Sequence, residues 1–149
     1  MLLQEVIRGF RPPPKITPAE WAERYRRMSS LESAFVGRFT FVLTPFFRWL
    51  LERWYDPAVR KIVCRKSAQI GWTQSVISNV LGFIVHIEKS TCVAMFPKVD
   101  LARNFDREKF GPMVEATPEL TEILPVRSRM KDVTTQFKSF PGGFVKFVG

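Results

Sequence analysis

The sequence predicts an α/β fold in which helices flank a parallel sheet. One observation is the stretch 61–81, which begins as a β-branched apolar run, passes through small and polar residues to a glycine, and continues with apolar residues at helical spacing. The other is the apolar run 91–96, which ends at Pro97 and is typical of a buried strand. Strand, helix and strand in this order predict a βαβ unit with a right-handed crossover.

Length and composition bound the fold and the classes of partner. The 149 residues are enough for one domain, and a hydrophobic fraction of 46% is enough to build a core. The formal net charge of +9 favours partners that carry phosphate, which include nucleic acids, nucleotides and anionic membrane surfaces. Charge alone does not choose among them.

The pattern of apolar residues predicts a soluble intracellular protein with no membrane contact. The longest apolar run, 80–87, is interrupted by Gly82 and His86 and is far shorter than the roughly 20 residues of a membrane span. The first residues lack the basic start and cleavage site of a signal peptide. The two cysteines, Cys64 and Cys92, lie in apolar runs, and we expect buried free thiols rather than a disulfide.

Residues 1–35 are predicted to form an N-terminal arm with an amphipathic helix. The proline-rich segment 11–15 is extended, and a capping box with a proline at the first helical position follows it, formed by Thr17, Pro18 and Glu20. Helical spacing predicts an apolar stripe of Trp21, Tyr25 and Met28, with Arg24, Arg26 and Arg27 on a basic outer face. The helix either packs on the protein surface or contacts DNA or a neighbouring subunit.

Residues 36–149 are predicted to form the main α/β unit, beginning with a strand-like run at 38–43. A helix then starts at Thr44 and Pro45 and ends before Pro57. Its aromatic face contains Phe46 and Phe47, which are candidates for stacking on a base. The alternative is that both rings pack into the core.

The stretch 66–73 follows the strand expected at 61–64 and resembles a phosphate-binding loop. The pattern G-x-x-x-x-G-K-[ST] can be laid on it with Gly71 as the second glycine and Thr73 as the hydroxyl residue. Lys66 stands where the first glycine is expected, and Trp72 stands in place of the usual lysine. Free N–H groups and the helix dipole make such a loop an anion site. Alternatively, Gly71 permits a tight turn and Thr73 caps a helix.

The remaining elements are predicted in order along the chain. Helices are expected from 72 to about 86, from 100 to 110 with Leu101, Ala102 and Phe105 facing inward, and from Thr117 onward with a capped start. Two strands around the turn 141–143 predict a β-hairpin. The basic segment before it is either a solvated loop or a DNA contact, and it contains Arg127, Arg129 and Lys131.

Six motifs in this order resemble the N-terminal part of phage terminase large subunits of the lambda type, the GpA family, over nearly the whole chain from Thr17. They are Trp21-Ala22-Glu23-Arg24-Tyr25, Thr44-Pro45-Phe46, the loop Lys66 to Thr73, Met95-Phe96-Pro97 with Ala102-Arg103-Asn104-Phe105, Pro112 to Pro118, and Phe140 to Phe144 with Val148-Gly149.

The resemblance implies a partial P-loop ATPase, which in full-length members precedes a metal-dependent nuclease. ATP and Mg²⁺ are the implied cofactors: the ATPase drives double-stranded DNA into the capsid, and the nuclease cuts the concatemer. Implied partners are double-stranded DNA, the terminase small subunit, the portal or prohead, and further copies of the motor subunit in the bacterial host cytoplasm. The implied phosphate-binding residues are Lys66, Ser67, Ala68, Gln69, Ile70, Gly71 and Trp72, with Thr73 as the Mg²⁺ ligand.

The sequence lacks the acidic residues that a complete P-loop ATPase needs. Within the 149 residues no apolar strand ends in the acidic pair that holds Mg²⁺ and orients the attacking water. By the resemblance, that pair and the nuclease carboxylates follow this segment, and strands missing between 61–64 and 91–96 leave a gapped sheet. Three hypotheses remain: the nucleotide-binding part of a motor, a non-catalytic DNA-binding or subunit-binding remnant of a truncated prophage gene, and an unrelated α/β protein.

Overall fold

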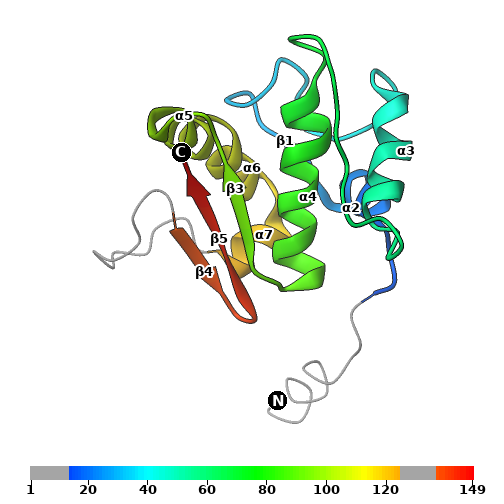
Figure 1. Ribbon diagram of the computed structural model, residues 1–149. Coiled ribbons are helices and arrows are strands. Elements are labelled where there is room, and N and C mark those ends of the chain that lie inside the picture. Colours follow the sequence, from blue (N-terminus) through cyan, green and yellow to red (C-terminus); the bar gives the residue numbers. More distant parts are fainter. Residues whose placement is uncertain (1–13, 125–136) are drawn as a thin grey trace.

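The computed structural model describes residues 14–124 and 137–149, and its architecture is α/β (Figure 1). The elements follow in the order α2 (Pro18–Tyr25), β1 (Arg27–Met28), β2 (Gly37–Arg38), α3 (Pro45–Trp54), η1 (Thr73–Ile77), α4 (Ser78–Phe83), η2 (Ile84–Glu88), β3 (Cys92–Met95), α5 (Val99–Phe105), η3 (Asp106–Phe110), α6 (Gly111–Ala116), α7 (Pro118–Ile123), β4 (Phe137–Phe140) and β5 (Gly143–Val148). The η segments are π-helical, and η1, α4 and η2 form one continuous helix, called here the central helix. Within the described ranges, no helix has the length and apolar character needed to cross a bilayer.

A mixed three-stranded sheet has the strand order β3, β5, β4. Strand β3 pairs in parallel with β5, and β4 pairs antiparallel to β5. The hairpin predicted around 141–143 is therefore confirmed. The strand predicted at 91–96 is also present as β3, but its parallel partner is β5 and not the segment 61–64.

The sheet is covered by helices on one face. Phe147 of β5 points to that face and packs against Phe105 and Phe110, with ring centroids 5.4 and 5.3 Å apart. Figure 1 shows α5, α6 and α7 behind the sheet. On the other face Val93 and Met95 of β3 are exposed, Met95 to 81%. Within the described part of the chain, β3 therefore has an uncovered apolar face and a free edge.

The segment 61–64 does not form the predicted strand. Residues 59–67 have no regular secondary structure, and Val63 is 80% exposed. A strand needs a neighbour for its backbone N–H and C=O groups, and no described strand pairs with this segment. The βαβ unit expected at 61–96 is thus absent from the described structure. Both cysteines are free, as predicted, but Cys64 is exposed and the expectation of a buried thiol is wrong there.

The N-terminal helix has the predicted capping box and ends earlier than expected. The Thr17 hydroxyl accepts from the Glu20 N–H at 3.2 Å, and the Glu20 carboxylate accepts from the Thr17 N–H at 2.8 Å. The helix ends at Tyr25, and the next residues form β1 instead of carrying the stripe to Met28. This change of direction turns Arg26 inward. The prediction that Arg26 lies on an outer basic face is wrong, because its side chain is completely buried.

Two further predictions on the later helices need correction. The helix expected at 100–110 runs on through α6, and Leu101 is exposed although Ala102 and Phe105 are buried as predicted. Helix α7 begins after Thr117, as expected, but the Thr117 hydroxyl does not cap it. That hydroxyl accepts instead from the Arg27 N–H at 3.2 Å, so a tertiary contact replaces the local one.

Helix α2 packs across the central helix through Trp21. A Cβ on Gly82 would lie 2.1 Å from Cη2 of Trp21, so glycine is required for this close approach. The Trp21 indole N–H donates to Nδ1 of His86 at 3.0 Å, and the ring of Tyr25 contacts His86 edge-on at 5.0 Å. Burial is the main cause that lowers the pKa of His86.

Replacing Gly82 by alanine is expected to destabilise the fold by about 2 kcal/mol through overpacking. Helix propensity alone predicts the opposite sign, because alanine favours a helix interior over glycine by about 1 kcal/mol. Urea unfolding followed by circular dichroism measures the difference. In a Trp21→Leu background the same change should cost much less, and an equal cost in both backgrounds would contradict the contact.

The fold is also expected to lose stability as the pH falls below about 6.5, the ordinary pKa of histidine. Folded His86 stays neutral because its pKa is lowered, so in this range the unfolded chain binds more protons and gains relative stability. The melting temperature at pH 7.5 and at pH 5.5 tests this, with His86→Asn as the control, since its amide oxygen can still accept from Trp21. The variant should show a smaller fall. An equal fall would assign the effect to other groups.

Candidate functional site

The loop 66–72 enters the central helix through two residues with left-handed backbone geometry. Gln69 has φ of 57° and Gly71 has φ of 81°. Residues that alternate between right-handed and left-handed conformations turn successive N–H groups to one side and form anion-binding concavities. The side chains of Ser67, Ala68 and Gln69 are exposed, so the loop is open to solvent. A Cβ on Gly71 would meet only ordinary contacts at 3.5 Å or more, and the backbone angle is what favours glycine.

The central helix begins at Thr73 with no side-chain cap. Trp72 is the N-cap residue and makes no side-chain capping hydrogen bond, and the first turn is closed by the Ser75 N–H, which donates to the Gly71 carbonyl at 2.8 Å. An uncapped helix start presents free N–H groups and the positive end of the helix dipole. The structure thus brings the loop and Thr73 to one helix end.

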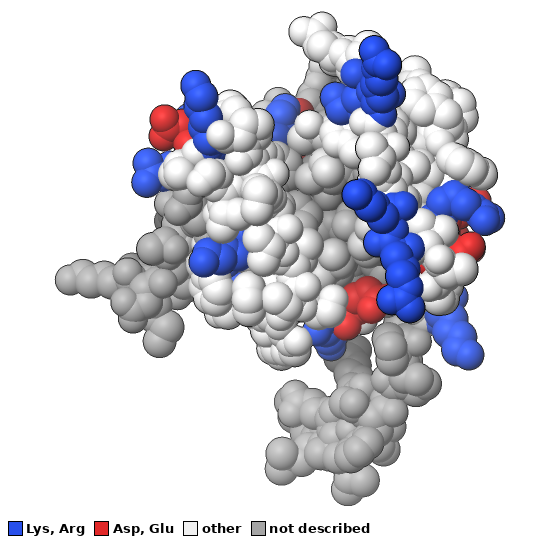
Figure 2. All heavy atoms as spheres, in the orientation of Figure 1, with Lys and Arg blue, Asp and Glu red and all other residues white. Residues whose placement is uncertain are grey.

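Lys66 lies at the front of this loop and is exposed. Its Nζ donates to the Ser67 carbonyl at 3.4 Å, and within the described ranges it forms no ion pair. Arg60, Lys61 and Arg65 in the preceding segment are exposed as well. Figure 2 shows basic side chains at the top of the view, where the loop lies, and along the same side below it. The local charge therefore favours an anion.

The start of helix α3 lies against the loop. The Thr44 hydroxyl is 2.9 Å from the Ser75 hydroxyl, and the Phe47 ring is 5.8 Å from the Trp72 ring. Phe47 is 3% exposed, whereas Phe46, whose ring is 4.4 Å from Phe47, is 56% exposed. Phe47 therefore packs in the core against the end of the loop, and Phe46 faces solvent beside it.

A buried polar cluster that the sequence analysis missed lies behind the loop. The Arg26 guanidinium forms an ion pair with Glu32 at 3.2 Å, donates to Asn79 Oδ1 at 2.6 Å, and donates to both the backbone carbonyl and the side-chain oxygen of Gln74. It also lies over the Phe39 ring at 4.9 Å. Burial lowers the pKa of Arg26 to about 10, so it stays charged at neutral pH. The sequence signal was weak, because the acceptors come from two separate segments, the turn at Glu32 and the central helix.

Three basic residues that the sequence analysis names as candidate DNA contacts, Arg127, Arg129 and Lys131, lie outside the described residues. Among the described residues no cluster of three or more His, Cys, Asp or Glu side chains is placed to hold a metal ion. Thr73 is therefore the one candidate metal ligand from the sequence that the described structure positions, at the first turn of the central helix.

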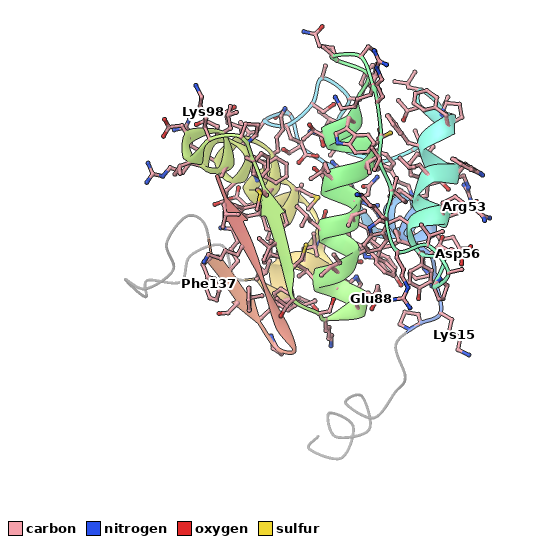
Figure 3. The ribbon with its side chains drawn as sticks, viewed as in Figure 1. Lys15, Arg53, Asp56, Glu88, Lys98 and Phe137 are labelled. Carbon is pink, nitrogen blue, oxygen red and sulfur yellow. The ribbon has the colours of Figure 1, made fainter. Side chains whose placement is uncertain are left out.

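An apolar groove separates the loop side of the molecule from the sheet. It lies over the central helix, beside the free edge of β3, has a volume of about 260 Å³ and has an almost wholly apolar lining: Leu50, Trp54, Ile62, Trp72, Val76, Ile77, Val80, Leu81, Cys92, Val93 and Ala94. A neighbouring cavity of about 950 Å³ shares Trp54, Cys92 and Val93 with the groove and is lined also by polar residues, among them Asp56 and Glu88 (Figure 3). The groove therefore lies where the predicted parallel neighbour of β3 is missing.

Two comparisons with known proteins match most of this chain. Residues 33–149 match the family described as phage terminase large subunit gpA, ATPase domain. The chain is also 26% identical over 135 residues to the terminase large subunit of Escherichia phage lambda. That alignment covers 90% of this chain and 20% of the relative, so the chain spans about a fifth of the relative's length. No solved structure matches the chain. Because the match covers well over half of its residues, the chain belongs to the family of phage terminase large subunits of the gpA type, within the ATPase domain.

Proposed function

We propose that this chain is the ATP-binding part of a DNA-packaging motor. The full-length protein would hydrolyse ATP to move double-stranded DNA into the capsid and would cut concatemeric DNA. The observation that carries the proposal is the exposed loop with two left-handed residues, which opens into the uncapped start of the central helix within the segment that matches the ATPase family. Such a loop suits the phosphates of a nucleotide.

Each loop residue has a role in the proposal. Lys66 contacts the phosphates from the front of the loop, in place of the usual lysine next to the hydroxyl residue. The backbone N–H groups from Ser67 through Ala68, Gln69, Ile70 and Gly71 to Trp72 surround the phosphates. Phe46 stacks on the adenine, while Phe47 supports it by packing on Trp72.

The residues present suit ATP and Mg²⁺ only in part. The loop, the exposed lysine and the hydroxyl of Thr73 are suitable for phosphate and for one metal ligand. Bound Mg²⁺ would neutralise charge on the phosphates. Since the described residues contain no acidic cluster for the metal, the remaining ligands and the group that orients water would come from outside the described residues.

The apolar groove supports the same view of an incomplete domain. Its floor is the central helix, one wall is the free edge of β3, and the other contains Ile62 from the unpaired segment. Further strands of the full-length protein would fill the groove and would pair with the free edge of β3 on one side and with the unpaired segment 61–64 on the other. In this proposal residues 1–35 are an N-terminal arm, and residues 36–149 are the first portion of the ATPase domain.

Partners follow from the proposed motor role. Double-stranded DNA, the terminase small subunit, the portal or prohead and further copies of the subunit would be contacted in the bacterial host cytoplasm. The basic segment with Arg127, Arg129 and Lys131 is proposed as a DNA contact. The competing function is a non-catalytic remnant that binds DNA or another subunit, and it predicts no nucleotide binding.

Replacing Lys66 by alanine is expected to weaken Mg²⁺·ATP binding at least tenfold. A charge-assisted hydrogen bond to phosphate contributes about 1.5–3 kcal/mol, and the variant loses it. Isothermal titration of the 149-residue chain measures the affinity. Lys61→Ala is the matched control, because it removes an exposed cation from the same segment and should bind almost as the unaltered chain does. Undetectable binding by the well-folded chain would reject the nucleotide site and favour the remnant.

Replacing Phe46 by alanine is expected to weaken ATP binding about tenfold, since stacking of a base on an aromatic ring contributes about 1–3 kcal/mol. Trp49→Ala provides the control: Trp49 lies on the same helix and is 62% exposed. Titration of both variants with ATP separates adenine stacking from a general loss of exposed aromatic surface. Equal affinities in the two variants would show that Phe46 does not contact the base.

A further inference from the structure

We infer that Arg26 is a positioning residue for the phosphate loop, which it acts on through Gln74. The inference rests on the proposed function, because it concerns the same nucleotide site. Arg26 lies at the end of α2, outside the segment that matches the ATPase family, yet its guanidinium reaches the first turn of the central helix. Its guanidinium forms hydrogen bonds to Glu32, Gln74 and Asn79, and among the described residues it forms none to the loop 66–73.

The contact falls directly behind the loop. Gln74 follows Thr73, and both its backbone carbonyl and its side-chain oxygen accept from the Arg26 guanidinium. A helix carbonyl normally accepts only from the N–H of a later turn, and a side chain that inserts into this ladder of hydrogen bonds bends the helix there. The helix is π-helical at this point, over Thr73–Ile77. The guanidinium thus helps to fix the position of the first helical turn, and therefore of Thr73, relative to the loop.

The guanidinium is itself held from two further sides. Glu32 pairs with it, and the Glu32 backbone carbonyl accepts from both the Gln74 side-chain amide and the Lys109 ammonium at 2.9 Å. Asn79 accepts from Arg26 and donates to the Ser75 carbonyl at 2.9 Å. The start of the central helix is therefore tied to the turn at residue 32 and to helix η3. The cluster of Arg26, Glu32, Gln74 and Asn79 therefore fixes the position of the start of the central helix.

The test is Mg²⁺·ATP titration of the 149-residue chain carrying Arg26→Lys or Gln74→Met. Lysine keeps the charge but loses the fork of donors, and methionine keeps the length of Gln74 but removes its acceptor and donor. Both variants should bind ATP about tenfold more weakly while circular dichroism shows the native fold at the titration temperature. Their Mg²⁺ dependence should also weaken, because Thr73 adjoins Gln74.

Lys138→Met is the matched control for stability. It breaks another largely buried ion pair, between Lys138 Nζ and Asp106 Oδ2 at 3.0 Å, on the sheet side of the molecule. It should lower the melting temperature and leave ATP affinity unchanged. Unaltered affinity in folded Gln74→Met, or an equal loss in Lys138→Met, would overturn the positioning role, even if Arg26→Lys fails to fold. Failure of the unaltered chain to bind ATP would instead reject the proposed function on which the inference rests.

Discussion

The burial of the Arg26 charge is the constraint on which the N-terminal half of the structure depends. A charge removed from water is tolerated only when nearby groups pair with it and accept its hydrogen bonds. Glu32, Gln74 and Asn79 supply these acceptors from two separate segments of the chain. Because removing one partner of such a pair costs about 3–5 kcal/mol, the segments cannot separate independently. The N-terminal helix is thereby joined to the helix that follows the loop.

One face of the central helix contacts Arg26 and α2, and its other faces contact different parts of the molecule. Toward α2 it presents buried polar or small residues, including Ser78, Asn79 and Gly82. Toward the groove it presents Val76 and Val80, which remain in contact with an open apolar space. Its start adjoins the loop. One helix therefore connects the candidate nucleotide site, the N-terminal region and the edge of the sheet.

The open groove explains why the sheet is smaller than the sequence implies. The run 61–64 has the composition of a buried strand, but a strand forms only where a neighbour accepts and donates its hydrogen bonds. In the described structure β3 uses one edge for β5 and leaves the other free. Both the unpaired run and the free edge line the same groove. Apolar surface of this kind favours association with another strand.

The features that depend on local physics could be predicted from the amino-acid sequence. The Thr17 capping box, the hairpin turn at 141–143 and the central helix follow from hydrogen bonds or side-chain spacing between neighbours in the chain, and the family was recognisable from ordered motifs. The inward direction of Arg26 and the unpaired run 61–64 could not be predicted in this way and follow from tertiary contacts. Both outcomes depend on partners distant in sequence, whose presence or absence a local pattern cannot encode.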